Sequence, residues 1–200
     1  MADGTLIMSL ETQAELPEED RGLVAAARKD THAAGRLFDK YYGQILRYID
    51  HSVQDHAAAE DLTSNVFFRA FQRLGLFRWR RIPFRAWLYR IATNEVRMHY
   101  RRQKRRLAFQ ARPPDQALAQ EAPSAGAEAV ALDDRRLLHR ALMDLGQKYR
   151  TVIVLRYFED KSLAEICAIT HKREGTIKSQ LHRGLSQLKQ ALARAGVGLP

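Results

Sequence analysis

Apolar residues recur every three or four positions along nearly the whole chain, and this spacing constrains the fold more than any other feature. On a helix, such a spacing gathers the apolar side chains on one face. The segments that carry it are residues 30–52, 55–74, 83–106, 130–145, 147–158, 162–169 and 174–194. No stretch shows a clear alternation with the period of two that marks a half-buried strand. The pattern therefore predicts an all-α fold.

A change of composition divides these helices into two groups. Residues 107–129 are dominated by Ala, Gln and Pro and contain three prolines. This composition is typical of a linker, because proline interrupts helices and the polar residues offer little surface to bury. We therefore expect two small helical domains, residues 22–106 and 130–194, joined by a flexible linker.

The net charge of +10 is concentrated in one segment. Residues 69–106 hold thirteen Lys or Arg and a single acid, Glu95, so the rest of the chain is nearly balanced. The first twenty residues hold six acids and no Lys or Arg, and we expect residues 1–21 to be a solvated, disordered leader. A concentrated basic segment favours a polyanionic partner such as nucleic acid.

The chemistry-bearing residues argue against an enzyme. The adjacent carboxylates Glu60-Asp61 and Glu159-Asp160 would point in different directions on a helix, and no glycine-rich phosphate loop or metal-ligand spacing is present. We expect no catalysis, no cofactor and no metal. The single cysteine, Cys167, excludes an intramolecular disulfide; a buried structural thiol fits its apolar surroundings better than a redox sensor. The sequence shows no signal peptide or membrane span, so we expect a cytoplasmic protein.

The last two helical segments form a helix-turn-helix pattern. Ser162 and Glu165 have the spacing of a capping box at the start of the short first helix, and a longer basic helix follows the turn. The N-terminal side chains of such a helix can reach base edges and phosphates in the major groove. A solvated basic face would give the same pattern. The side chains expected to contact duplex DNA are Lys172, Arg173, Thr176, Lys178, Ser179, His182 and Arg183.

This part of the chain resembles region 4 of the sigma factors of bacterial RNA polymerase. The similarity covers residues 147–192 and is closest at Arg150–Asp160 and at Gly175–Ser179, with His182-Arg183 following. In that family the second helix reads the −35 element of the promoter. The resemblance therefore implies that the basic helix enters the major groove there.

The first half resembles region 2 of the same family. Residues 59–71 resemble the segment that docks on the polymerase β′ subunit. The resemblance assigns to polymerase binding Glu60, Asp61, Leu62, Asn65, Val66, Phe67, Arg69 and Ala70. Residues 83–94 resemble the helix that holds the melted −10 strand, where aromatic and basic side chains suit unpaired bases and their phosphates. The −10 residues implied are Phe77, Arg78, Trp79, Arg80, Arg81, Trp87, Arg90, Asn94, Arg97 and Arg101. For Trp87 itself, a core position is the favoured interpretation.

Both domains resemble the family in the right order, and nothing resembles the domain that larger sigma factors carry between them. The resemblance implies a sigma-70 family factor of the extracytoplasmic-function (ECF) type. Its expected partners are core RNA polymerase, through β′ and β, and promoter DNA; an anti-sigma factor is a further expected partner. We expect a monomer when free, with no membrane insertion. The alternative is a stand-alone helix-turn-helix regulator of duplex DNA, which leaves the first half unexplained.

The turn of the helix-turn-helix departs from the family pattern. His171 stands where glycine is typical, so the sequence predicts a non-glycine residue with positive φ. Arg173 replaces the usual serine cap, and a lost cap of this kind costs about 1 kcal/mol. Met98 and Gln180 replace the Asp and Arg that are common in the family. These differences bear on which −35 sequence is read.

Overall fold

The computed structural model describes residues 18–53, 55–79, 82–110 and 129–195, and within them it contains helices and turns but no strand. The all-α prediction is confirmed. The first domain comprises α1 Glu18–Ala26, α2 Thr31–Val53, α3 His56–Gln72, the 3₁₀ turn η1 Leu74–Leu76 and α4 Phe84–Gln110. The second comprises α5 Ala129–Asp144, α6 Gln147–Ile153, the π-helical turn η2 Val154–Phe158, α7 Leu163–Thr170 and α8 Glu174–Arg194.

The first domain is a bundle in which α2, α3 and α4 pack on one another. The stripe that predicted α2 is its buried face, with Leu37, Tyr41, Ile45, Tyr48 and Ile49 inward. The hydroxyl groups of Tyr48 and Thr93 share a hydrogen bond of 2.9 Å. Burial, the largest influence, raises the pKa of Tyr48 to about 12. The bundle thus buries neutral polar groups only where they find a partner.

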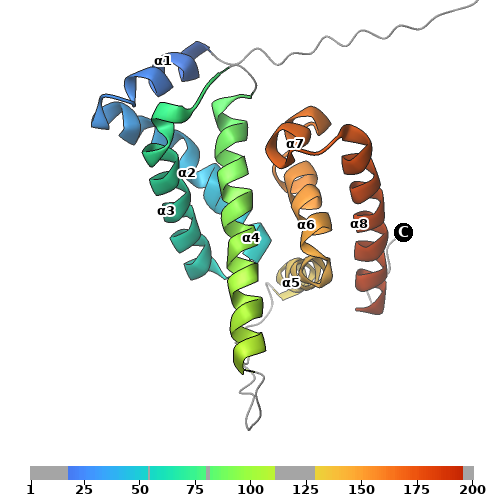
Figure 1. The fold of residues 1–200 in the computed structure, drawn as a ribbon. Helices are drawn as coiled ribbons and strands as arrows, with labels where there is room; N and C mark the ends of the chain where they lie inside the picture. The colour runs from blue at the N-terminus through green and yellow to red at the C-terminus, as the bar shows by residue number, and fades with distance from the viewer. Residues whose placement is uncertain (1–17, 54, 80–81, 111–128, 196–200) are drawn as a thin grey trace, which may run out of the picture.

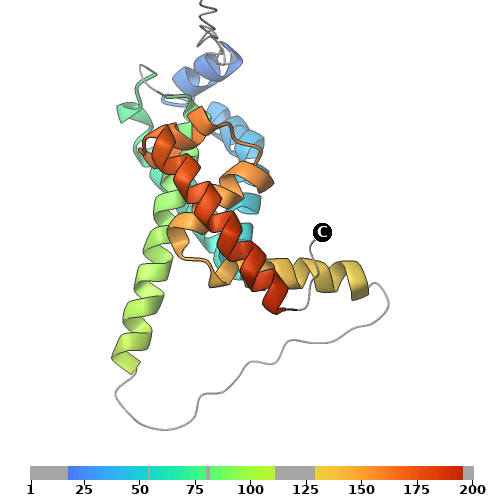
Figure 2. The ribbon, with the colours of Figure 1, turned by 90° about the vertical axis from the view of Figure 1, so that its right-hand side faces the viewer.

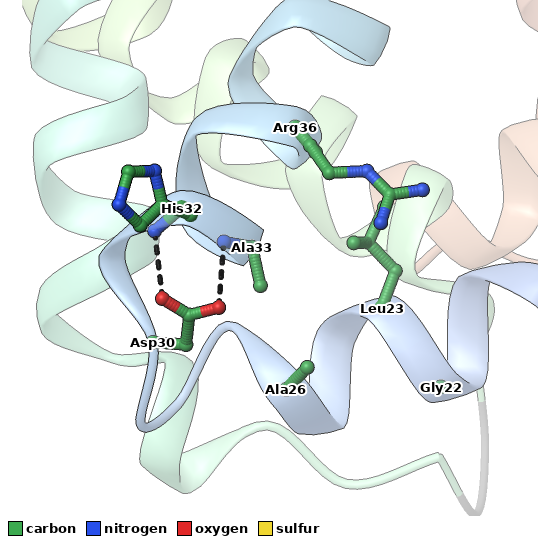
Figure 3. Close-up of a pocket in the computed structure, with 7 residues that line it drawn as sticks. All are labelled: Gly22, Leu23, Ala26, Asp30, His32, Ala33 and Arg36. Atoms are coloured by element: carbon green, nitrogen blue, oxygen red, sulfur yellow. Dashed lines mark hydrogen bonds between the residues drawn. The ribbon is translucent and has the colours of Figure 1, made fainter.

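Helix α1 corrects the prediction of a disordered leader at residues 18–21, because α1 begins at Glu18. Asp20 is buried, accepting a hydrogen bond of 2.5 Å from the Tyr41 hydroxyl and pairing with Lys40 at 2.7 Å. Counting acids could not reveal that one of them has partners on α2. Asp30 then accepts hydrogen bonds from the backbone N–H groups of His32 and Ala33, which caps the start of α2 (Figure 3).

Helix α4 is longer than predicted. It runs to Gln110, four residues past the expected end of the first domain at residue 106, and its lower end extends beyond the rest of the first domain (Figures 1 and 2). The rest of the expected linker, up to residue 128, lies outside the described residues. Pro83 directly precedes the helix, and its carbonyl accepts the first helical hydrogen bond, from Trp87 N–H at 3.0 Å.

The second domain packs α8 across α6 and α7. Gly184 lies where α8 crosses α6: a Cβ atom there would come within 2.9 Å of Ile153 Cδ1. After η2, Asp160 takes a positive φ of 49° and turns the chain toward α7. The close approach of α8 to α6 therefore depends on Gly184, which has no side chain.

The two domains contact each other directly. Helix α4 lies between the first-domain helices and the second domain, with α7 beside its upper half (Figure 1). Helix α2 also contacts η2 and α5. Helix α8 lies on the outer side of the second domain, away from α4 (Figure 1). The helix that resembles a −10 reader is therefore at the domain boundary, and the helix that resembles a −35 reader is at the surface.

Candidate nucleic-acid and polymerase interfaces

The helix-turn-helix has the local geometry that its sequence predicts. Ser162 Oγ accepts from Glu165 N–H at 3.2 Å, and Glu165 Oε2 accepts from Ser162 N–H at 2.9 Å, which completes the capping box. His171 ends α7 in the left-handed conformation, with φ of 58°. Arg173 caps α8 without a side-chain hydrogen bond. Both departures from the family pattern therefore have the predicted structural consequence.

The outer face of α8 is open to solvent. Ile177, Leu181, Leu188 and Leu192 face inward. The predicted duplex-DNA residues whose side chains are exposed are Arg173, Thr176, Lys178, Ser179, His182 and Arg183. Lys178 pairs with Glu174 one turn earlier, at 2.7 Å, which is an exposed pair that contributes little to stability. Helix α8 thus presents donors and positive charge on one accessible face.

Lys172 differs from the other six predicted duplex-DNA residues. It is only partly exposed, and its ammonium donates to Gln180 Oε1 at 2.9 Å. Burial, followed by repulsion from Arg97 and Lys148, lowers its pKa. Gln180, a departure from the family pattern, therefore holds this lysine in place.

Five of the predicted −10 residues lie at spacings of three and four on α4: Trp87, Arg90, Asn94, Arg97 and Arg101. Such a spacing places them along one side of the helix, and this set is called the α4 stripe below. Asn94, Arg97 and Arg101 are exposed, whereas Trp87 and Arg90 are partly buried. Trp87 packs against Phe77 and Phe84, with ring centroids 5.0 and 5.6 Å away. This supports the interpretation of Trp87 as a packing residue.

The segment before α4 is built around a buried aromatic ring. Phe77 is 3% exposed and contacts the rings of Trp79 and Phe84. The side chains of Arg78 and Trp79 are exposed and partly exposed, respectively, while the predicted −10 residues Arg80 and Arg81 lie outside the described residues. Phe77 therefore supports this segment from inside rather than offering a surface to a base.

The predicted polymerase-binding residues of α3 divide into two faces. Leu62, Val66, Phe67 and Ala70 are buried in the core, and Arg69 pairs with the buried Glu95 of α4 at 2.9 Å. Glu60, Asp61 and Asn65 are exposed. Only Glu60, Asp61 and Asn65 are directly available to a partner; the other residues hold α3 in place within the bundle.

Phe68 is a surface residue that sequence reasoning missed. Its side chain is 61% exposed, three residues after Asn65 and seven after Asp61, so it shares their face of α3. Val66, Phe67 and Phe68 form a run of three apolar residues, and such a run does not indicate which member is exposed. Aromatic rings are enriched at protein-binding surfaces, so an exposed ring on this face favours a protein partner.

A polar interface between the domains was also missed. The buried Tyr89 hydroxyl donates to Glu159 Oε2 at 2.5 Å, and Lys161 lies 4.7 Å from the centroid of the Tyr89 ring. Burial, followed by the Glu159 carboxylate, raises the pKa of Tyr89. Arg85 pairs with Glu165 at 2.5 Å. No spacing in the sequence relates residues some 70 or 80 positions apart, so only the tertiary structure could reveal these pairs.

Arg150 forms a second interdomain contact. It is 7% exposed and donates within its own domain to the carbonyls of Leu142, Met143 and Leu145. Across the boundary it donates to Ser52 O at 3.1 Å and to the Tyr100 hydroxyl at 2.7 Å. An arginine offers five N–H donors in a fixed plane, which allows one side chain to join several carbonyls.

Among the described residues, no helix is long and apolar enough to cross a membrane, and no group of three or more His, Cys, Asp or Glu is placed to hold a metal ion. Cys167 is partly buried, and burial raises the pKa of its thiol. A raised pKa keeps a thiol protonated and unreactive, which agrees with a structural role.

The two domains match two family models in the order of the chain. Residues 37–106 match Sigma-70 region 2, and residues 135–188 match Sigma-70, region 4. The ECF RNA polymerase sigma factor BldN of Streptomyces coelicolor is 31% identical over 191 residues, covering 96% of this chain and 67% of the relative. The ECF RNA polymerase sigma factor SigW of Bacillus subtilis is 31% identical over 181 residues, covering 82% of this chain and 90% of the relative.

Solved structures show the same fold. The sigma factor RpoE of Bartonella quintana, in complex with the anti-sigma factor NepR, superposes with a TM-score of 0.62 at 21% identity, covering 80% of this chain and 96% of that one. CnrH, in complex with the cytosolic domain of CnrY, superposes with a TM-score of 0.66 at 24% identity, covering 88% and 97%.

These matches define a class of protein: a sigma-70 factor made of regions 2 and 4. Within that class, the chain belongs to the ECF RNA polymerase sigma factors. The family identified from sequence is confirmed. The alternative of a stand-alone helix-turn-helix regulator is wrong, because the first domain matches region 2.

Proposed function

We propose that this sigma factor binds core RNA polymerase through the exposed face of α3, holds the melted −10 strand with the α4 stripe, and reads the duplex −35 element with α8. The observation that carries this assignment is the exposure of polar and basic side chains on both helices, at Asn94, Arg97 and Arg101 and at Ser179, His182 and Arg183. Each set lies on a rigid helix, which is the support that specific recognition needs.

The chemistry of the two surfaces suits different forms of DNA. The basic side chains of α4 continue into Arg102, Lys104, Arg105 and Arg106, all exposed, and such a surface neutralises a backbone without reading sequence. The face of α8 combines hydroxyl, imidazole and guanidinium groups, which suit base edges and phosphates of a duplex. The role is therefore positioning of DNA and polymerase, with no chemical step performed by this chain, and we place it in the cytoplasm with the enzyme.

The α3 surface offers Glu60, Asp61, Asn65 and Phe68 to core polymerase. A carboxylate cluster beside one exposed ring suits a basic partner surface with an apolar contact at its centre. An anti-sigma factor is a further proposed partner, since one structural neighbour, RpoE of Bartonella quintana, is a sigma factor bound to an anti-sigma factor.

In vitro transcription tests the proposal. Purified core polymerase is assayed on a library of promoter fragments with and without this protein. Defined start sites that depend on the protein are expected, and their upstream sequences would supply the −10 and −35 elements. If a folded sample neither binds core polymerase nor directs initiation, the proposal is wrong.

A further inference from the structure

The segment that leads into α4 is held by α1 and by the turn that follows α1. From that turn, the Arg28 guanidinium donates to the carbonyl of Phe77 at 2.8 Å. From α1 itself, the guanidinium of Arg21 lies 5.8 Å from the centroid of the Trp79 ring, which is the range of a cation–π contact. Residues 77–79 are therefore contacted at two points, one on the main chain and one on a side chain.

The turn that carries Arg28 is bound on both sides. At its start, the carbonyl of Ala26 accepts hydrogen bonds from the N–H groups of Lys29 and Asp30, at 2.9 and 3.0 Å. At its end, the Asp30 carboxylate caps α2 (Figure 3). Because the backbone is fixed on both sides, only the rotamers of the Arg28 side chain remain to be ordered when it binds the carbonyl.

Helix α1 is anchored to the rest of the first domain through its inner face. Val24 is fully buried in the core, and the buried Asp20 accepts a hydrogen bond of 2.5 Å from Tyr41 of α2. A helix of nine residues is not stable alone in water. These contacts therefore determine where Arg21 and the turn with Arg28 lie.

The last two residues of the contacted segment are the ones that can meet an unpaired base. Phe77 is buried, whereas Arg78 is exposed and Trp79 is partly exposed. Arg78 donates to the carbonyls of Gly75, at 2.8 Å, and of Phe77, at 3.4 Å, so two guanidinium groups share the Phe77 carbonyl. A ring and a guanidinium suit a base and its phosphate, but they discriminate between bases only if the backbone beneath them is fixed.

We propose that Arg21 and Arg28 are positioning residues for recognition of the −10 strand, and we call the two the α1 support: they fix the main chain at Phe77 and the ring of Trp79. The inference rests on the proposed function. The match to Sigma-70 region 2 begins at residue 37, so it assigns no role to the α1 support. Both arginines are exposed and fill no space in the core, so their role lies in these contacts rather than in the packing of the bundle.

A promoter library in which each −10 position is randomised tests the α1 support. Arg28→Met removes the donor to the Phe77 carbonyl. Lys29→Met is the matched control, because it removes the same charge from the next residue, which is also exposed. Transcripts made by core polymerase with each full-length variant are sequenced. The preference of Arg28→Met for the favoured bases should fall about fivefold, because a loosely held segment discriminates less, whereas Lys29→Met should keep the preference of the parent.

The ratio between bases separates positioning from a merely structural role. A loss of folded protein lowers initiation from every promoter by the same factor and leaves that ratio unchanged. Thermal melts and core-binding assays on the same samples show how much of the Arg28→Met variant is folded and bound. A base preference equal to that of the parent, in a folded variant that binds core polymerase, would overturn the inference.

Fluorescence of the free protein tests the contacts without polymerase. The chain has two tryptophans, so a Trp87→Phe background leaves Trp79 as the only one. In that background, Arg21→Met and Arg28→Met should each raise the acrylamide quenching of Trp79 about twofold, because the ring loses a neighbour or its backbone loses a bond. Lys29→Met should leave the quenching as it is. Quenching that is unchanged in both arginine variants would contradict the α1 support.

The two proposals fail differently. If the parent protein directs no initiation, the proposed function is wrong, while the quenching of Trp79 still reports whether the α1 support holds the ring. If the parent initiates normally and Arg28→Met keeps both its base preference and its quenching, the proposed function stands and the inference fails.

Discussion

Helices α4 and α8 carry similar chemistry but meet different surroundings. On α8, the residues assigned to the −35 element are exposed from Thr176 to Arg183, and the inner face packs on α5, α6 and α7 of its own domain. On α4, Tyr89 is buried against the second domain and Arg90 is bound to α7. The comparison teaches that a helix proposed as a nucleic-acid surface can also be an internal surface. Under the proposed function, DNA and the second domain would compete for Arg90 of α4.

The largest expected effect comes from Arg150, which joins the second domain to the first by hydrogen bonds. Arg150→Met removes donors to three carbonyls of its own domain and to Ser52, and leaves buried carbonyls unpaired. We expect the free energy of unfolding to fall by about 3 kcal/mol. Urea denaturation of the full chain measures it. Lys148→Met, at an exposed position on the same helix, should stay within about 0.5 kcal/mol of the parent; an equal loss would mean that Arg150 is no more important than a surface residue.

The inner face of α8 can be tested with two glycines. Gly184→Ala places a Cβ 2.9 Å from Ile153 Cδ1 and 3.2 Å from Tyr149 Cβ, so the Ile153 side chain or α8 must shift; overpacking of this kind costs about 1–3 kcal/mol, which exceeds the helix-propensity gain of up to about 1 kcal/mol. Gly175→Ala meets nothing within 4 Å and should stabilise the helix by up to about 1 kcal/mol. Thermal melts of the two variants should move in opposite directions. A shift of the same sign in both would contradict the close packing of α8 on α6.

Substitutions on the outer faces of α4 and α8 should affect different steps, strand melting for α4 and duplex binding for α8. Asn94→Ala should reduce open-complex formation about tenfold and leave core binding intact, because Asn94 is exposed on the α4 stripe. Arg183→Ala should weaken binding to the −35 element by about 1–3 kcal/mol without changing strand melting on a promoter that lacks that element. Potassium permanganate footprinting distinguishes melting from duplex binding. Loss of core binding in Asn94→Ala would point to a structural role for that residue.

The smallest expected effect is a pH dependence of the packing between the two domains. His139 of α5 is partly buried; burial, followed by repulsion from His51 of α2, lowers its pKa below the ordinary value of 6.5, while Asp50 acts in the opposite direction. Its ring lies 5.5 Å from that of His51 across the domain boundary. The packed arrangement of the two domains favours neutral His139, so it keeps its full stability above pH 6.5.

As pH falls below 6.5, a chain whose two domains have separated gains a proton more readily than the packed chain, and the packing between the domains weakens until the lowered pKa is passed. The radius of gyration of the free chain should therefore increase between about pH 7 and pH 5.5. His139→Asn should reduce this change. A radius that is independent of pH in the parent protein would contradict the prediction.

Local features were well predicted from sequence. The apolar stripe of α2, the capping box of α7, the positive φ of His171 and the uncapped Arg173 all follow from spacings of a few residues. The family was recognisable from continuous motifs for the same reason. Where sequence reasoning failed, a partner from another element decided the outcome: Asp20 of α1 accepts a hydrogen bond from Tyr41 of α2, and Phe77, after η1, packs against Phe84 of α4. Assignments of −10 residues remain predictions for the exposed members of the stripe.

By itself, the sequence determined an all-α protein of two sigma-factor domains and the helices that carry its basic side chains, because helix formation and amphipathicity depend on neighbours within one or two turns. Only the tertiary structure decided which of those side chains are free. Glu159 and Arg150 are charged residues in an amphipathic stretch, and nothing local to them specifies Tyr89 or Ser52 as partners. Burying a charge is favourable only where a second surface supplies its hydrogen bonds, and that surface exists only once both domains have packed.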